Sequence, residues 1–216
     1  MRVAVLCSGR GSNLQSLLDA AKSGALGGAQ IVVVACNMPG AGAIDRAKAA
    51  GIAVELVEHK AHADRASFER ALVERLRAHR VDLVCLAGFL RIVGPVFLAA
   101  FPDRVLNIHP SLLPSFPGLH AQRQALDAGA RFSGCTIHFV DAGTDSGPIL
   151  SQATVPVLAG DTEDALAARI LVAEHRIYPD AVKLVASGLV TLEGRRVRVA
   201  GVEHPDEAPR FNPPLS

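Results

Sequence analysis

The sequence has 216 residues, enough to bury the core of one large α/β domain and slightly too few for two. Half of the residues are hydrophobic and a fifth are charged, which excludes a disordered chain. The 22 basic and 21 acidic residues leave a net charge of +1, so the composition disfavours nucleic acid or an anionic membrane surface as a partner.

Four cysteines are spread along the chain: Cys7, Cys36, Cys85 and Cys135. The first three lie in apolar, strand-like runs. This placement favours buried, reduced thiols over a disulfide framework or a metal cluster, as in a reducing cytoplasm. The first residues lead directly into a strand pattern without the apolar core of a signal peptide, and no apolar run approaches the ~20 residues that span a bilayer. We therefore expect a soluble cytoplasmic protein.

The first half of the chain alternates apolar runs with segments of helical periodicity. Strands are predicted at residues 3–7, 30–37, 52–57 and 81–88, and helices at residues 14–21, 41–51 and 67–80. Strands and helices that alternate at this spacing form a parallel sheet with right-handed crossovers. Ligands of such sheets gather beyond the carboxyl ends of the strands.

The second half has a different pattern. After a strand at 104–109 and a helix at 119–129, two longer strands at 132–140 and 148–157 leave no room for a helix between them, so this pair is expected to be antiparallel. A long helix with an acidic first turn is predicted to begin at Asp161 and to be kinked or interrupted near Pro179.

The expected fold class is therefore α/β. We expect a Rossmann-like, mostly parallel twisted sheet with antiparallel C-terminal strands and helices on both faces. No internal repeat or linker divides the sequence. We expect one domain over residues 1–202 and a flexible, proline-rich tail over residues 203–216.

Two polar side chains, Asn107 and His109, end the apolar strand at 104–109. Residues two apart in a strand share a face, so the amide and the imidazole point the same way. Pro110 stops the strand, and the proline-rich loop after it is rigid. The pair favours a built site with a hydrogen-bond donor and a titratable group, although a buried pair satisfied by the backbone is the alternative.

The first turn, residues 8–13, leads straight into a helix, where free backbone N–H groups and the helix dipole favour an anion. Leu14 stands where a dinucleotide fingerprint needs glycine, and the second strand ends in Asn37 where an acidic residue is typical. One phosphate group is the simplest ligand. A tight turn with Ser12 or Asn13 as the helix N-cap is equally consistent with these residues.

Two further places carry weaker signals. Asp141 and Asp145 in the loop at 141–147 are typical of a solvated turn, but a carboxylate within reach of His109 would favour the imidazolium form. Residues 90–93, with Arg65 upstream, could line a slot for a flat ligand with an acidic end, or begin a helix with a surface ion pair.

Four motifs together resemble the folate-dependent formyltransferases: SGRGSN at 8–13, LAGFLRI at 86–92, NIHPSLLPSFPGLHAQRQAL at 107–126 and DSGP at 145–148. The resemblance runs from Val3 to about Leu192. The early GSN turn and AEHRIYP at 173–179 favour the members that act on 5-phosphoribosylglycinamide in purine synthesis. The resemblance implies transfer of a formyl group from 10-formyltetrahydrofolate to the primary amine of that ribotide, on a formyltransferase-type Rossmann-like fold, with no metal.

By the same resemblance, Asn107, His109 and Asp145 are catalytic. The amide and a protonated imidazole suit the oxyanion of a tetrahedral intermediate, and the carboxylate would hold the imidazole charged and help to move the proton. The resemblance assigns the ribotide to Gly11, Ser12, Asn13 and Glu174. It assigns the folate to Arg65, Leu90, Arg91, Ile92, Val93, Asn107, Val140, Asp141, Ala142, Gly143 and Thr144.

The sequence departs from relatives at Leu171, where some carry a polar residue that could bond the ribotide. His59 and His62 match no family ligand and are expected at the surface. His120 and His138 are expected to be structural, or to contact the catalytic side chains without touching the substrate.

Two other functions stay open. Methionyl-tRNA formyltransferase and 10-formyltetrahydrofolate hydrolase share the catalytic trio, but they resemble longer chains with a further domain for which this sequence has no room. A non-catalytic phosphate-binding α/β module would use only the first turn. The expected partners are small-molecule substrates, without nucleic acid or membrane, in a monomer or homodimer.

Overall fold

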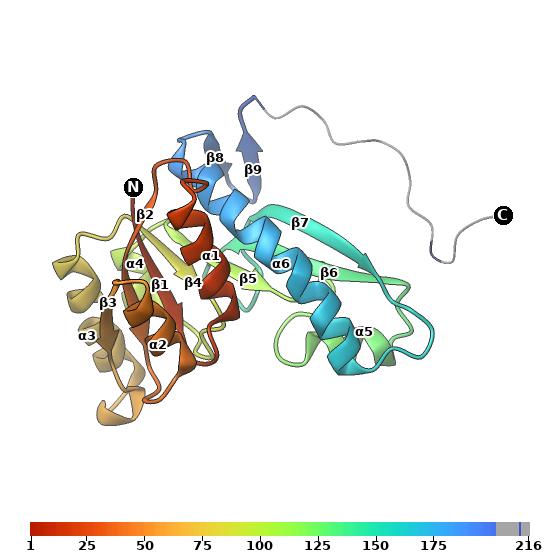
Figure 1. Ribbon diagram of the computed structural model, residues 1–216, viewed down its shortest axis with the longest axis horizontal. Helices are drawn as coiled ribbons and strands as arrows, with labels where there is room; N and C mark the ends of the chain where they lie inside the picture. Colours follow the sequence, from red (N-terminus) through yellow and green to blue (C-terminus); the bar gives the residue numbers. More distant parts are fainter. Residues whose placement is uncertain (202–211, 213–216) are drawn as a thin grey trace.

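A seven-stranded mixed sheet runs through the molecule, with strand order β3-β2-β1-β4-β5-β6-β7 (Figure 1). The structure is a computed structural model that describes residues 1–201 and residue 212. Five strands are parallel: β1 (Arg2–Cys7), β2 (Gln30–Cys36), β3 (Ala53–Leu56), β4 (Leu83–Leu86) and β5 (Val105–His109). Antiparallel to β5 comes β6 (Phe132–Phe139), and antiparallel to β6 comes β7 (Ile149–Pro156). The predicted fold class is confirmed.

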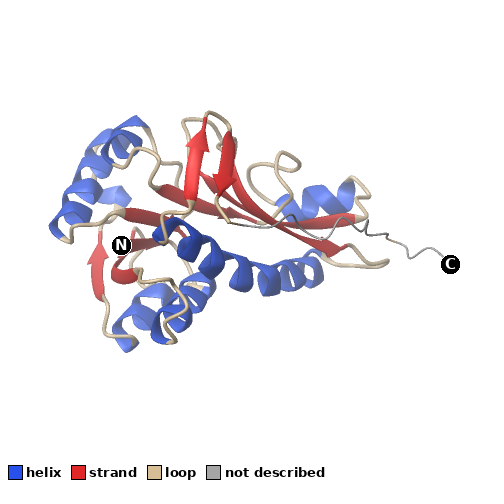
Figure 2. Ribbon diagram, turned by 90° about the horizontal axis from the view of Figure 1, so that it is seen from above, coloured by secondary structure: helices blue, strands red, loops and turns tan. Residues whose placement is uncertain are grey.

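Helices cover both faces of the sheet, which explains why the parallel strands are almost continuously apolar. Along β1, Val3, Val5 and Cys7 face one core, and Ala4 and Leu6 face the other. The first core is closed by α1 (Ser12–Lys22), α2 (Gly42–Ala49) and α6 (Glu163–Ala186); the second is closed by α3 (Arg65–Ala78) and α4 (Pro95–Ala100). Figure 2 shows α6 running along its face of the sheet. A single turn, η1 (His59–Ala61), precedes α3.

A third, smaller core lies beside the antiparallel strands. Ala125 of α5 (Ala121–Asp127) packs with Cys135 of β6, Val155 of β7 and two residues of α6, Leu166 and Ile170. All four cysteines are buried and unpaired, as the apolar runs around three of them predict.

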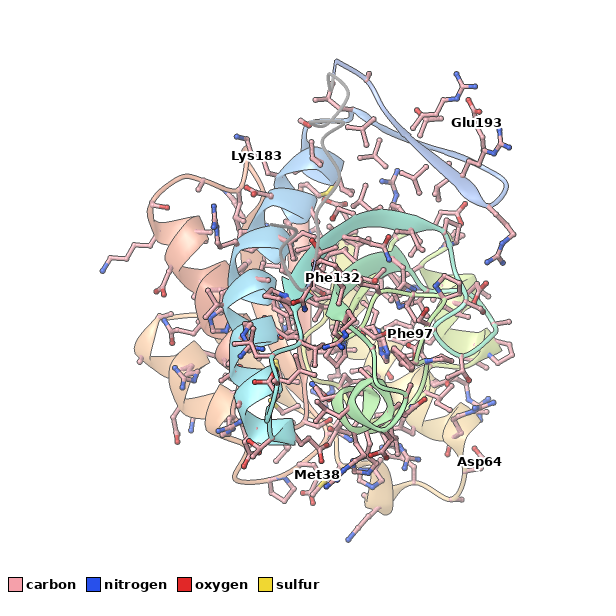
Figure 3. The ribbon with its side chains drawn as sticks, turned by 90° about the vertical axis from the view of Figure 1, so that its right-hand side faces the viewer. Met38, Asp64, Phe97, Phe132, Lys183 and Glu193 are labelled. Carbon is pink, nitrogen blue, oxygen red and sulfur yellow. The ribbon has the colours of Figure 1, made fainter. Side chains whose placement is uncertain are left out.

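A hairpin of β8 (Val190–Glu193) and β9 (Arg196–Val199) comes after α6 and was not predicted. Its strands have only four residues each and are exposed on every second residue, so no apolar run announces them. Gly194, with φ 62°, sits in the tight turn between them. Figure 3 shows the hairpin, marked by Glu193, at the opposite end of the molecule from the start of α3, marked by Asp64.

Helix α6 differs from its prediction at its first residue and at Pro179. Thr162 is the N-cap and accepts a hydrogen bond from the Ala165 N–H at 3.2 Å, whereas Asp161 stays outside the helix and pairs with Arg169 at 2.7 Å. The predicted interruption at Pro179 is wrong, because the helix continues through it to Ala186.

The predicted flexible tail, residues 203–216, lies outside the described residues except for Asn212. The Asn212 side-chain amide donates to the Val157 carbonyl at 2.9 Å and to the Arg131 carbonyl. The single domain over residues 1–202 stays a prediction. Among the helices of residues 1–201, we find none with the length and apolarity needed to cross a membrane.

Candidate active site

Three side chains predicted to be catalytic meet beside the end of β5. His109 Nδ1 lies 3.3 Å from Asp145 Oδ2. Asn107 Nδ2 lies 3.2 Å from His138 Nε2, which in turn lies 3.7 Å from Asp145 Oδ1. These contacts join Asn107, His138, Asp145 and His109 into one cluster of four side chains, which we call the β5 cluster.

The register of β5 against β6 places His138 in this cluster. Asn107 is paired with His138 across the antiparallel ladder, so the two side chains lie on the same face. The imidazole of His138 faces the Phe139 carbonyl oxygen with Nδ1 at 2.9 Å. Because a carbonyl only accepts, Nδ1 carries the proton, and Nε2 is left to accept an N–H of Asn107. The amide therefore keeps its second N–H for another partner.

Burial lowers the pKa of His138 and outweighs the opposing effects of the Phe139 carbonyl and the Asp145 carboxylate. The imidazole is therefore neutral at neutral pH, as its hydrogen bond from Asn107 requires. His138 was expected to be structural or supporting, and the structure places it in direct contact with two of the three predicted catalytic side chains.

This shift predicts how stability depends on pH. The folded-state pKa of His138 lies below the ordinary value of 6.5, so the unfolded chain takes up a proton more readily as the pH falls. The stability that the folded protein gains by keeping His138 neutral is fully present above the ordinary His pKa. This stability is lost as the pH falls through the lowered pKa of the folded state. We compare the thermal midpoint at about pH 7.5 and about pH 5, which lie on either side of the usual His pKa. We expect it to fall less between these two pH values in His138→Gln than in the native protein. Equal falls in the two proteins would contradict this assignment.

His109 is buried between two acceptors. Its Nε2 lies 2.9 Å from the Phe116 carbonyl oxygen, and its Nδ1 faces the Asp145 carboxylate. Only a ring protonated at both nitrogens can donate to both neighbours. The geometry therefore favours an imidazolium that is fixed in place. His109 is only 5% exposed.

Asp145 is held in place from two sides. Its Oδ2 accepts the Gly118 N–H at 2.8 Å, which ties it to the proline-rich loop after β5. Its own φ is 49°, a left-handed conformation that aspartate tolerates better than most residues. A Cβ on Gly147 would lie 1.8 Å from the Phe139 carbonyl oxygen, so glycine is needed where this loop returns to the sheet. The DSGP motif thus fixes a carboxylate against an imidazole.

The predicted phosphate turn also has a demanding geometry. Gly11 is the N-cap of α1, with φ 74°, and no side chain caps the helix. The alternative in which Ser12 or Asn13 is the N-cap is therefore wrong, and the first-turn N–H groups have no side-chain acceptor among the described residues. A Cβ on Gly11 would lie 2.9 Å from Ala43 Cα. The backbone of α2 thus packs directly against the turn.

Asn13 and Glu174, both predicted for the ribotide, meet between α1 and α6. Asn13 Nδ2 donates to Glu174 Oε2 at 2.8 Å, and burial raises the pKa of this carboxyl although the Asn13 hydrogen bond opposes the shift. One turn later in α6, the buried Tyr178 hydroxyl donates to the Leu86 carbonyl at 3.0 Å, which fixes the helix against the end of β4. Within the described chain, the buried Asn13 Oδ1 has no donor. Leu171 lies half-buried nearby in the same helix.

Most of the predicted folate residues fall on two loops, whereas Arg65 begins α3 and Asn107 lies in β5. Leu90 and Ile92, in the loop after β4, are 73% and 64% exposed, whereas Val93 is buried in the core beneath α3 and α4. In the loop after β6, Asp141 turns inward and accepts from Ser146 Oγ at 2.7 Å. The exposed residues of that loop are Ala142, Gly143 and Thr144.

Other predicted residues lie apart from the β5 cluster. His59 and His62 are half-buried against Phe68 instead of lying at the surface, with ring centroids 6.4 and 5.8 Å away. His120 is exposed and lies 3.9 Å from Glu163.

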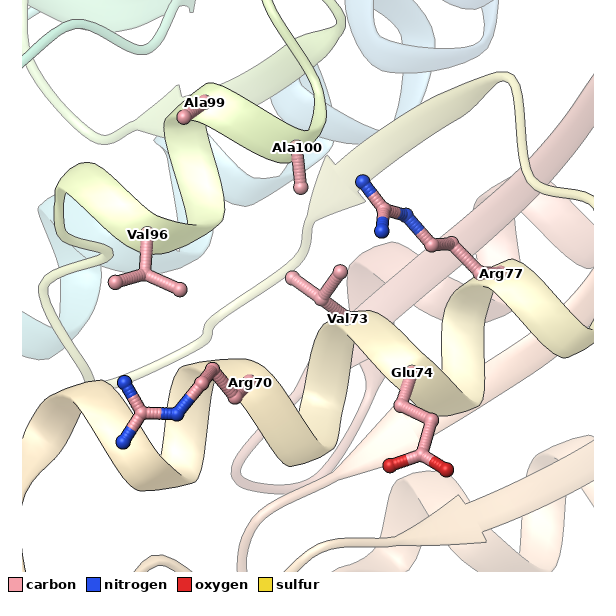
Figure 4. Close-up of a pocket in the computed structure, with 7 residues that line it drawn as sticks. All are labelled: Arg70, Val73, Glu74, Arg77, Val96, Ala99 and Ala100. Carbon is pink, nitrogen blue, oxygen red and sulfur yellow. The ribbon is translucent and has the colours of Figure 1, made fainter.

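A hollow of about 400 Å³ between α3 and α4 contains none of the predicted site residues (Figure 4). Its lining comprises Arg70, Val73, Glu74, Arg77, Val96, Ala99 and Ala100. Within residues 1–201 and 212, no group of three or more His, Cys, Asp or Glu side chains could hold a metal ion.

The Gly11 geometry predicts a selective defect. We expect Gly11→Ala to raise the KM for a phosphorylated substrate about tenfold or more, because a left-handed φ costs roughly 1–2 kcal/mol for other residues and the added Cβ meets Ala43. Gly9→Ala is the matched control, since a Cβ there has nothing within 4 Å. Steady-state kinetics of both variants measure the effect, and equal KM values would contradict it.

The site joins an amide, two imidazoles and a carboxylate beside a central strand of a Rossmann-like sheet. Comparison with protein families identifies the class of protein to which this arrangement belongs. The model of the family described as formyl transferase matches residues 1–182, so this chain belongs to the formyltransferase family. The resemblance predicted from the four motifs is confirmed.

Individual relatives narrow the comparison. The chain is 41% identical to phosphoribosylglycinamide formyltransferase of Escherichia coli (strain K12) over 207 residues, which are 96% of this chain and 97% of that protein. The crystal structure of glycinamide ribonucleotide transformylase 1 from Symbiobacterium toebii matches with a TM-score of 0.91 and 52% identity, over 92% of this chain and 93% of that one. The trifunctional purine biosynthetic protein adenosine-3 of Drosophila melanogaster is 50% identical over 87% of this chain, but the chain spans only 14% of that protein's length.

Proposed function

We propose that this protein transfers the formyl group of 10-formyltetrahydrofolate to the primary amine of 5-phosphoribosylglycinamide, giving the N-formyl ribotide and tetrahydrofolate. The bacterial relatives that the chain covers almost completely are named phosphoribosylglycinamide formyltransferase, which gives the acceptor and the transferred group. The donor is the one that the resemblance to the folate-dependent formyltransferases implies. The observation that carries the proposal is the contact of His109 with Asp145 at 3.3 Å, next to Asn107, at the end of a strand.

The cluster suits attack by an amine on a formyl carbon. The amine lone pair forms the new C–N bond, and the formyl oxygen gains negative charge in the tetrahedral intermediate. The second N–H of Asn107 donates to this oxyanion, and the cation of His109 stabilises it. The intermediate collapses when the bond to N10 of the folate breaks, and the proton lost by the amine ends on N10, with Asp145 as the group able to relay it.

Both ring nitrogens of His109 already face protein acceptors, so neither N–H is free to donate to the oxyanion. Asn107 and His109 therefore have different roles. Asn107 supplies the hydrogen bond to the oxyanion, and His109 acts chiefly as a fixed positive charge held by Phe116 and Asp145. A charge of this kind is strongest where water is excluded, and the low exposure of His109 meets that condition.

The ribotide is assigned to the space between the phosphate turn and α6. Its 5′-phosphate is bound by Gly11, Ser12 and Asn13 at the N-terminus of α1, where the backbone N–H groups and the helix dipole favour an anion. Glu174 contacts the ribose or the glycinamide group.

The folate is assigned to the two loops on either side of β5. The exposed side chains of Leu90 and Ile92 supply apolar walls for the pterin, together with the loop at 140–144. Arg65 and Arg91 are exposed and face the glutamate end of the folate. Asn107 lies where the formyl group meets the amine, and no metal takes part in the proposed mechanism.

Dependence on the acceptor tests the proposal. Purified protein with 10-formyltetrahydrofolate is expected to release tetrahydrofolate only when 5-phosphoribosylglycinamide is added. Release with methionyl-tRNA as acceptor, or formate release without any acceptor, would instead favour the two relatives that share the trio. Absence of release under all three conditions would contradict the enzyme assignment.

A further inference from the structure

The loop of residues 87–94, which carries four of the eleven residues assigned to the folate, is held at both ends by side chains from elsewhere in the chain. At the near end, Ser8 Oγ accepts the Leu90 N–H at 2.8 Å, and the Ser8 N–H donates to the Gly88 carbonyl at 3.0 Å. At the far end, Glu69 Oε1 accepts the Gly94 N–H at 2.5 Å. Between these anchors the side chains of Leu90 and Ile92 extend into solvent.

Glu69 is a carboxylate in an unusual position. It lies on the inner face of α3 and is only 2% exposed, so its charge needs partners. Two of its partners belong to the end of the loop and to the first turn of α4: the Gly94 N–H, and the Phe97 N–H at 3.2 Å from Oε2. The third is Arg65 Nε, 3.7 Å from Oε1. One buried side chain thus contacts both the loop and an arginine assigned to the folate.

The fit at the far end is tight. A Cβ on Gly94 would lie 2.7 Å from Glu69 Oε1 and 3.0 Å from Arg65 Nε. Only a residue without a side chain lets the backbone approach this carboxylate. The Arg65 side chain is 53% exposed, so its outer nitrogens remain open to a ligand while Nε faces Glu69.

The near end is held with a defined orientation. The Ser8 hydroxyl donates to Asn37 Oδ1 at 2.7 Å, so its lone pair is directed to the Leu90 N–H. Ser8 also begins the turn assigned to the phosphate. Neither Ser8 nor Glu69 is among the residues assigned to a substrate.

We propose that Glu69, with Ser8 at the opposite end, is a positioning residue for the formyl donor. It fixes the end of loop 87–94 and the Arg65 side chain, so that the apolar slot exists before the folate binds. This inference rests on the proposed function, because it concerns the same folate site. It predicts that loss of Glu69 weakens folate binding and spares the ribotide.

Glu69→Gln tests the inference. The amide keeps the shape of the side chain but has one acceptor oxygen where the carboxylate has two, and it loses the charge that faces Arg65. We expect the Kd for tetrahydrofolate, measured by calorimetry, and the KM for 10-formyltetrahydrofolate to rise about tenfold, the loss typical of a charge-assisted hydrogen bond. The KM for the ribotide and kcat at saturating donor are expected to stay within about twofold.

Glu74→Gln is the matched control. Glu74 lies on the same helix, is exposed, and lines the hollow of Figure 4 instead of the loop. It undergoes the same chemical change, and its Kd for tetrahydrofolate is expected to equal that of the native protein. Ser8→Ala provides a second variant for the case that Glu69→Gln does not fold, and it too is expected to raise the Kd for tetrahydrofolate.

The outcomes separate this inference from the proposed function. Unchanged Kd values in both variants, or equal rises in the KM of both substrates, would overturn the positioning role and leave the enzyme assignment standing. Native protein that binds tetrahydrofolate without formylating the ribotide would overturn the proposed function, and the Kd values would still decide the role of Glu69. Native protein that does not bind tetrahydrofolate would overturn both.

Discussion

His109→Ala is expected to lower kcat by about 10³-fold at saturating concentrations of both substrates. The change removes the positive charge beside the reacting carbon and leaves Asp145 without its partner at 3.3 Å. Loss of one group that stabilises an oxyanion costs roughly 3 to 4 kcal/mol of barrier, or about 10²- to 10³-fold in rate, and His109 also holds the carboxylate that relays the proton. Single-turnover and steady-state assays with the ribotide measure the loss.

The buried position of His109 requires a companion variant. Alanine leaves a cavity next to the Phe116 carbonyl and can lower stability as well as rate. His109→Gln fills more of that space and can donate neutral hydrogen bonds through its NH₂ group, so we expect near-native circular dichroism. The rate is still expected to be at least about 10²-fold below native, because the charge is missing. His120→Ala is the control, since His120 is exposed and touches no member of the β5 cluster.

This experiment also decides between an enzyme and a binding module. A non-catalytic phosphate-binding module that uses only the turn at residues 8–13 predicts unchanged phosphate affinity and unchanged biological activity in His109→Ala. A rate within tenfold of native for His109→Gln would show that the positive charge is not needed, and the division of work between Asn107 and His109 would then be wrong.

The backbone positions of Asn107 and His109 could be predicted from the sequence because they depend only on local rules. Strand periodicity fixes their common face, and Pro110 marks where the strand ends. The order of strands and helices likewise predicts a parallel sheet, since short crossovers leave few alternatives. Local order therefore suffices for β5 and its neighbours.

Contacts that join distant segments could not be predicted in this way. His138 enters the cluster because β6 pairs with β5 in one register, and a shift of one residue would turn its side chain to the other face. Glu69 lies in a helix of ordinary amphipathic pattern, and nothing in that pattern shows that its carboxylate reaches Gly94. Each of these residues gains its role from a partner at least 25 positions away.

The missed details of local structure have a physical reason as well. An asparagine just after a glycine turn usually caps a helix, but Asn13 instead bonds Glu174, which lies 161 residues further along the chain. The tertiary contact outweighs the local preference, and it leaves the first turn of α1 open for a ligand. Deviations of this kind, where a local rule yields to a distant partner, coincide here with the proposed ribotide site.

Asp145→Asn is expected to lower kcat by about 10²-fold with little change in fold. Asparagine tolerates the left-handed φ of 49°, and its amide oxygen can still accept the Gly118 N–H. The variant removes only the charge and one acceptor. The oxygen that accepts the Gly118 N–H is also the one that faces His109 Nδ1, so in the variant a neutral amide oxygen stands beside the imidazole. Without the negative charge, the variant favours a neutral imidazole where the native protein favours a cation.

Two measurements distinguish this electrostatic effect from a loss of structure. Nitrogen chemical shifts of the His109 ring are expected to show two protonated nitrogens in the native protein and one in Asp145→Asn at the same pH. Asp164→Asn, an exposed aspartate in the first turn of α6, is expected to change neither the ring nor the rate. If the ring keeps the same protonation state in Asp145→Asn while kcat falls, the carboxylate acts by relaying the proton alone, because the charge on His109 then does not depend on it.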